Sequence, residues 1–239
     1  MAEVSRHGDL VLNFDGGIRP RVLPRTQAVP VRAEFSARVR SQSGGRLPGL
    51  TRLKIEINRN AQVRTRGLPL CPLRRVRHAR TGEALNNCGD SVVGEGSFGV
   101  EIHFPDQLPN QARGRIHFFH SRYKGAPALI MHGYVARPAP VAVAVPLRVE
   151  RNPRGPYGMT LSSPSLPAVW GNNIRTTRFR FDFGRLYRAG GRDRSYLSAA
   201  CRAPNALDGA FFNLARATYE FTDGARIRET LLDSCRVSR

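Results

Sequence analysis

Two short motifs have the spelling of nucleotide-binding residues in protein kinases. Residues 94–100 read GEGSFGV, as a glycine-rich phosphate loop does, and residues 181–184 read FDFG. A kinase also needs a lysine on the strand after the glycine loop, and an HRD segment with a downstream asparagine before the DFG aspartate. Lys124 lies instead in the turn-like SRYKGAP, and no HRD precedes Asp182. Both motifs are therefore interpreted as coincidences, and we expect no ATP binding.

The same glycines also fit the GxGxxG fingerprint of dinucleotide-binding proteins. That motif works only where it opens a helix, because the helix N-terminus must face the pyrophosphate. Residues 100–105, VEIHFP, follow it here and have the character of a strand. The glycines are therefore expected to shape a turn or a β-bulge. The sequence predicts no cofactor.

Central histidines and carboxylates are the remaining candidates for catalysis or metal binding. They are His103, His117, His120, His132, Asp90, Glu95, Glu101 and Asp106. His117 and His120 are three residues apart, so they face opposite sides of a regular strand. The carboxylates come from a loop and a strand with no evident partner, and no GxSxG elbow is present. We predict no metal site and no catalytic residue, with a secreted hydrolase as the third choice of function.

The net charge of +20, from 38 basic and 18 acidic residues, predicts anionic polymers as partners, either cell-wall polymer or nucleic acid. Only Lys54 and Lys124 are lysines, so the excess of arginine also reflects GC-rich codons. The local candidate for polymer contact is the run Arg74, Arg75, Arg77 and Arg80. Guanidinium groups bind phosphate and carboxylate in a bidentate way. The alternative, which the sequence favours, is a solvated rim around a small helix.

Strands must position most of these residues. Apolar and polar residues alternate along 30–40, 51–58 and 178–184, and less cleanly along 215–221 and 225–231. This period of two indicates antiparallel sheets with one face in water. A single helix is expected at 81–88, with Thr81 as its N-cap. The predicted fold class is all-β, with two antiparallel β-sandwich-like domains and one short helix in a disulfide loop.

Proline content suggests where the two domains meet. Residues 137–156 contain five prolines, and a residue without an N–H is not expected in a central strand. We therefore predict an N-terminal domain over 1–138, a proline-rich connection over 139–156 and a C-terminal domain over 157–239. No stretch approaches the ~18–20 apolar residues that span a bilayer, so no membrane span is predicted.

The four cysteines show no CxxC pair and no zinc-finger spacing. The pairing that places one bridge in each predicted domain joins Cys71 to Cys88 and Cys201 to Cys235. A crossed pairing and four reduced thiols are the alternatives. Two bridges imply an oxidising compartment and hence export. The first seventeen residues lack the apolar core of a secretion signal, so export would require a start upstream of Met1.

Six segments along the chain also carry a resemblance. They are GGIRPRVLPR (16–25), GLPLC (67–71), ALNNCGDSVVG (84–94), RSYLSAACRAP (194–204), FTDG (221–224) and the Ser-Cys pair at 234–235. Together they resemble a group of uncharacterised exported proteins of high-GC actinobacteria. The resemblance implies export and both cysteine pairings, and it implies no known activity. We expect a non-enzymatic structural or adhesive protein, extracellular or at the cell envelope, with a nucleic-acid-binding protein as the alternative.

We predict that native protein purified in air contains no free thiol. Mass analysis under non-reducing conditions should find one peptide pair joining Cys71 to Cys88 and another joining Cys201 to Cys235. Four alkylatable cysteines would contradict export, and a Cys88–Cys201 linkage would contradict the separation into two domains.

Overall fold

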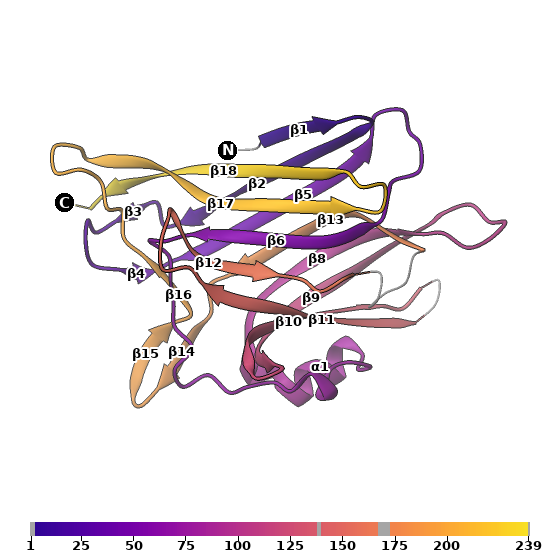
Figure 1. The fold of residues 1–239 in the computed structure, drawn as a ribbon. Coiled ribbons are helices and arrows are strands. Elements are labelled where there is room, and N and C mark those ends of the chain that lie inside the picture. Colours follow the sequence, from indigo (N-terminus) through magenta and orange to yellow (C-terminus); the bar gives the residue numbers. More distant parts are fainter. Residues whose placement is uncertain (1–2, 138–139, 167–172, 239) are drawn as a thin grey trace.

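The computed structural model describes residues 3–137, 140–166 and 173–238 (Figure 1). The strands are β1 (Glu3–His7), β2 (Leu10–Arg19), β3 (Val22–Leu23), β4 (Val29–Pro30), β5 (Arg32–Ser41), β6 (Leu50–Asn58), β7 (Gln62–Val63), β8 (Val92–Ile102), β9 (Asn110–Tyr123), β10 (Ala126–Val135), β11 (Val141–Arg151), β12 (Tyr157–Ser162), β13 (Ile174–Phe183), β14 (Leu186–Ala189), β15 (Arg192–Ser195), β16 (Leu197–Ala199), β17 (Gly209–Phe221) and β18 (Arg226–Val237). The helical elements are η1 (Leu73–Arg75), α1 (Thr81–Cys88) and η2 (Gly89–Ser91). The predicted all-β class with one short helix is confirmed.

Thirteen strands form one large sheet in the order β1-β2-β5-β13-β8-β9-β10-β11-β12-β6-β17-β18-β3. Neighbouring strands are antiparallel except for the short parallel pair of β18 and β3. The sheet curls until β18 contacts β1 and β2, so its two ends meet (Figure 1). Two smaller sheets, β14-β15 and β4-β16-β7, lie at one end of the curl. The curl encloses a single elongated interior.

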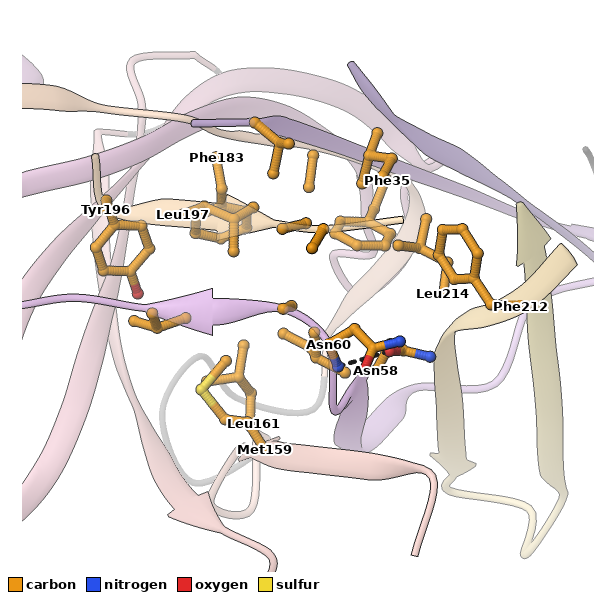
Figure 2. A pocket seen from close by; sticks show the side chains of 18 of the residues that line it. Phe35, Asn58, Asn60, Met159, Leu161, Phe183, Tyr196, Leu197, Phe212 and Leu214 are labelled. Atoms are coloured by element: carbon orange, nitrogen blue, oxygen red, sulfur yellow. Dashed lines mark hydrogen bonds between the residues drawn. The ribbon is translucent and has the colours of Figure 1, made fainter. Parts of the chain in front are cut away.

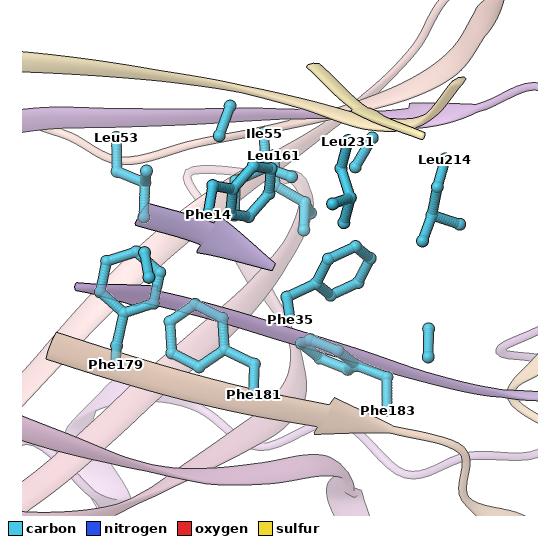
Figure 3. Close-up of a cluster of buried hydrophobic side chains, with 14 of the residues drawn as sticks. Phe14, Phe35, Leu53, Ile55, Leu161, Phe179, Phe181, Phe183, Leu214 and Leu231 are labelled. Atoms are coloured by element: carbon cyan, nitrogen blue, oxygen red, sulfur yellow. The ribbon is translucent and has the colours of Figure 1, made fainter. Parts of the chain in front are cut away.

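Alternation along the strands fills that interior. Phe179, Phe181 and Phe183 of β13 are buried, whereas the residues between them are exposed or half-buried. Phe118 of β9 packs edge-on against Phe181, with ring centroids 4.9 Å apart. The ring centroid of Tyr219 of β17 lies 6.2 Å from that of Phe179. Figure 3 shows aromatic and aliphatic side chains pointing inward from both walls. Such pairs add to the free energy of burial in offset and edge-on geometries.

The predicted division into two domains does not match the sheet. β13 from the C-terminal segment pairs with β5 and β8 from the N-terminal segment, and β17 pairs with β6. Strands from 1–138 and 157–239 therefore alternate in one sheet and share one core. The predicted connection over 139–156 is also corrected, because β11 pairs with β10 and β12 through most of it. Its Pro146 lies inside the strand, opposite Ile130.

Helix α1 and the disulfide loop cover the outside of β9, β10 and β11. Cys71 and Cys88 are bonded to each other, and they pack with Phe119, Ile130 and Ala144 in a small buried cluster. The backbone N–H of Cys71 donates to the carbonyl of His120. This second layer explains why β9 is buried on both faces.

The helix spans the expected residues, Thr81–Cys88, but its N-cap lies one residue earlier than the sequence predicts. Arg80, not Thr81, occupies the N-cap position, and its backbone N–H donates to the Glu83 carboxylate at 2.8 Å. The carboxylate in the first turn satisfies an N–H that has no partner within the helix and suits the positive end of its dipole. A hydroxyl at the N-cap is therefore not needed. Among the described residues, no helix is long and apolar enough to cross a membrane.

The kinase-like glycines lie inside strand β8 and not in a turn. A Cβ atom at Gly96 would overlap the carbonyl oxygen of Arg180 on β13. A Cβ at Gly94 would lie 2.5 Å from the nearest atom of the Phe183 ring. The bulge expectation holds locally, because the β8–β9 register shifts between Val92 and Gly94. The glycines thus allow β8 and β13 to approach closely, and the β8 backbone pairs with strands on both sides.

We predict that Gly96→Ala destabilises the protein by about 1–3 kcal/mol, because the added methyl overlaps backbone that cannot move aside. Gly82→Ala is the matched control, since a Cβ there meets nothing within 4 Å. The helical position of Gly82 should make that change stabilising by about 0.5–1 kcal/mol. Urea unfolding of both variants checks the prediction. Equal effects of the two substitutions would contradict the close approach.

Candidate anion-binding site

Arginines from three strands lie side by side on the outer face of the sheet. Arg38 of β5 is directly opposite Arg178 of β13. Arg178 is opposite Gly99 of β8, and Gly99 is opposite Arg113 of β9. Because neighbouring strands are about 4.8 Å apart, the three arginines cross four adjacent strands in one row. This row, Arg38, Arg113 and Arg178, is named the arginine row.

Gly99 gives the row its shape. A Cβ at Gly99 would lie 3.0 Å from Cγ and 3.1 Å from Nε of Arg178. The Arg178 side chain therefore extends across β8, over the position where a side chain is missing. Arg38 and Arg113 are exposed and Arg178 is half-buried.

The arginine row borders a shallow surface hollow of about 340 Å³. Arg40 and the loop residues Gly44, Gly45 and Leu47 complete its wall on one side. Its carboxylate, Glu101, accepts a hydrogen bond from Gln111 at 2.9 Å and lies 3.5 Å from His103. The hollow therefore contains four guanidinium groups and one carboxylate that already has neighbours.

The next rows on the same face contrast with the arginine row. Arg180 pairs with Glu34 at 2.9 Å, and Arg32 pairs with Asp182 at 3.0 Å. Burial raises the pKa of Asp182, an effect that Arg32 opposes. Within the described ranges, no ion pair involves Arg38, Arg40, Arg113 or Arg178. Like charges directly opposite each other in a sheet are destabilising, and a bound anion would relieve that repulsion.

The arginine run predicted from the sequence lies elsewhere. Arg74, Arg75, Arg77 and Arg80 are all exposed around η1 and the start of α1. This helical layer sits at the lower edge of the molecule in Figure 1. The chain thus presents two separate basic surfaces, of which the sequence indicated one.

The fold brings two of the candidate histidines together and separates the others. His132 of β10 is directly opposite His117 of β9, and both are buried beneath the disulfide loop. His132 Nε2 lies 2.9 Å from the carbonyl oxygen of Ala79. His120 lies instead with Nδ1 3.2 Å from the carbonyl oxygen of Pro69. In the part of the chain that the structure describes, no group of three or more His, Cys, Asp or Glu residues could hold a metal ion.

The candidate carboxylates are equally scattered. Glu95 and Glu101 occupy two positions of β8, where Glu95 lies 3.6 Å from Arg115. Asp90 is exposed in η2, and Asp106 is exposed in the turn between β8 and β9. The structure gives them separate environments and brings no two of these four together as a hydrogen-bonded or charge-paired unit.

A small cavity lies inside the curl, near the smaller sheets (Figure 2). Its volume is about 50 Å³, and its walls are almost entirely apolar. Asn60 donates its backbone N–H to the Asn58 side chain at 2.8 Å on one side of it. One water needs roughly 10–15 Å³, so this space is too small for a substrate.

Sequence reasoning missed the arginine row because its members are far apart in the chain. A signal was available, since Arg38 and Arg178 occupy polar positions of two segments predicted as alternating strands. Only the pairing of β5 with β13 makes them neighbours. Comparison with protein families, with curated proteins and with solved structures finds no match for this chain.

We predict that the protein loses stability as the pH falls below about 6.5. Burial lowers the pKa of His132 and of His117 below the ordinary value of 6.5. On acidification the unfolded chain therefore binds protons at these histidines before the folded chain does. Their contribution to the free energy of unfolding is fully present above pH 6.5 and is lost as the pH falls below that value. His132→Gln keeps a donor for the Ala79 carbonyl without titrating, and it should flatten the decline. Urea midpoints at pH 7.5 and 5.0 measure this, and an unchanged slope in the variant would contradict it.

Proposed function

We propose that this protein is an exported, non-enzymatic protein that binds an anionic polymer at the cell envelope through its outer arginine face. Its role would be structural or adhesive. The observation that carries the proposal is the arginine row, where Arg38 and Arg178 are directly opposite without an acidic partner among the described residues. Phosphate or carboxylate groups repeated along a polymer match guanidinium groups repeated across a sheet.

Export is supported by the two disulfides, Cys71–Cys88 and Cys201–Cys235. Such bonds persist in oxidising compartments and are rare in the cytosol. The second bond ties the segment after β16 to β18, and the first holds α1 against β9 and β10. Both bonds pin peripheral segments onto the large sheet, as suits a protein that works outside the cell.

Nucleic acid is the alternative polymer. An electrostatic surface of this kind binds duplexes through counterion release and does not distinguish sequences. Sequence-specific readout requires an element that enters the major groove and reaches base edges. The arginine row lies on a broad sheet face, which favours contact with a flexible polymer over groove insertion.

We predict that removing the arginine row weakens polymer binding more than removing the same charge elsewhere. The test variant is Arg38→Ser, Arg113→Ser and Arg178→Ser together, titrated with a poly(glycerol phosphate) and with random-sequence DNA. The matched control is Arg74→Ser, Arg75→Ser and Arg77→Ser. At 50 mM salt the test variant should bind about 10-fold to 100-fold more weakly, and its salt slope should fall by about 2 to 3.

A second variant leaves the charge unchanged. Gly99→Val inserts a side chain beneath Arg178 and displaces a flexible group, so the fold should persist while polymer affinity falls. Equal losses for the two arginine triples would mean that net charge alone is responsible. Tight binding of one DNA sequence at 150 mM salt would instead favour the nucleic-acid alternative.

A further inference from the structure

A larger cavity lies inside the curled sheet, at the end where β5 finishes and β6 begins. Its volume is about 270 Å³, with walls from β8, β9, β10, β11 and β13. Among the residues that line it, Phe98, Met131 and Val143 are half-buried, whereas Ile116 and Phe181 are buried. Native interiors seldom keep an empty apolar space of this size, because unfilled volume is destabilising. The cavity is thus a candidate site for an apolar ligand.

Two glycines keep the cavity open. Phe98 lines the cavity from β8, and the edge of its ring, Cε1 and Cζ, lies next to Gly114 of β9 and Gly133 of β10. A Cβ at Gly114 would come within 2.6 Å of the ring, and one at Gly133 within 2.8 Å. Any larger residue at these positions would therefore push the ring away from the wall and toward the cavity.

The cavity reaches the surface at one side. Phe104 and Val141 are each 37% exposed and line it there, together with the exposed Asn173. Large exposed apolar residues at the mouth of an apolar cavity give an unbranched chain a continuous path inward. The polar side chains among the described lining residues are Ser163, Asn173 and Thr176, and none of them carries a charge.

The charged residues nearest this end do not line the cavity. Ile174 and Thr176 line it, so Arg175 between them starts on the other face of β13, where it is directly opposite Glu101 of β8. Arg46 borders a separate surface hollow together with Asp9 and Asp223. The cavity therefore offers an uncharged space that suits a hydrocarbon chain.

We propose that this cavity binds the unbranched hydrocarbon chain of a single-chain amphiphile, whose polar head lies at the mouth. An apolar cavity of about 150 Å³ holds benzene, so this one accommodates on the order of ten carbons. The ligand would be a fatty acid or a single-chain lipid. Binding inside the curl does not involve the arginine row, so the inference stands apart from the proposed polymer binding.

The test is calorimetry on the full disulfide-bonded chain with decanoate below its micelle concentration, in 0.5 M NaCl to suppress polymer-type attraction. We expect saturable binding of one molecule per chain. Over hexanoate, octanoate and decanoate, affinity should rise by about fourfold per methylene. It should stop rising near ten carbons. A ten-carbon lysophosphatidylglycerol in the same assay distinguishes a lipid source from a free fatty acid.

Two variants close the cavity and one control does not. Val143→Phe fills it directly, and Gly133→Ala fills it by displacing Phe98. Each should weaken decanoate binding at least tenfold while urea unfolding shows a folded protein. Val4→Phe makes the same change on the exposed strand β1, where Val4 is 60% exposed, and should bind as the wild type does.

Absence of saturable binding at 1 mM decanoate would overturn the proposal. Wild-type affinity in both folded cavity-closing variants would overturn it too, because the ligand would then bind elsewhere. Loss of decanoate binding in the Arg38, Arg113 and Arg178 triple variant would likewise assign the ligand to the outer face. Retained decanoate binding in a variant that no longer binds polymer would separate the two sites.

Discussion

Phe179, Phe181 and Phe183 point from β13 into the space between the two walls of the curled sheet, where Phe118 and Tyr219 pack on them from other strands. A sheet of thirteen strands has no interior unless it curls. Burial of this aromatic cluster provides the hydrophobic free energy that favours the curled form. The register follows from it, because a slip of one residue would send the phenylalanines into water. Every outward-facing side chain of these strands, including the arginines, is placed by that requirement.

The two faces of the same strands therefore carry different chemistry. On β8, Phe98 and Val100 border the larger cavity, while Gly99 between them lies under the side chain of Arg178. Glycine has one role on the outside, where it makes room for a guanidinium group, and another on the inside, where Gly133 makes room for a ring. A single layer of backbone thus separates the arginine row on the outer face from the apolar cavity on the inner face.

The two disulfides hold peripheral segments of the chain against the large sheet. Cys71 is bonded to Cys88, and its backbone pairs with His120 while its carbonyl accepts a hydrogen bond from Ser121. The loop and α1 are thereby fixed over β9 and β10, where His132 is buried beneath them. Cys201–Cys235 does the same for the segment that follows β16. By the chain-entropy model, loops of these lengths contribute about 3–4 kcal/mol each, mainly by restricting the unfolded chain.

Local patterns were sufficient for the all-β class, the short helix and the main strands, because burial of one face imposes a period of two that is legible in residues 51–58 or 178–184. The favoured cysteine pairings, Cys71–Cys88 and Cys201–Cys235, are present, although the two-domain division used to choose between the alternatives does not match the sheet. The order of the strands in the sheet could not be predicted from the sequence. Hydrogen bonds between β5 and β13 join residues about 140 positions apart, and no local pattern indicates such a pairing. The two-domain division was wrong for that reason, and Pro146 was misleading because its neighbours in β11 supply enough ladder bonds to keep it in the sheet. The arginine row and the larger cavity likewise exist only where distant strands meet, so they depend on tertiary contacts and not on any contiguous motif.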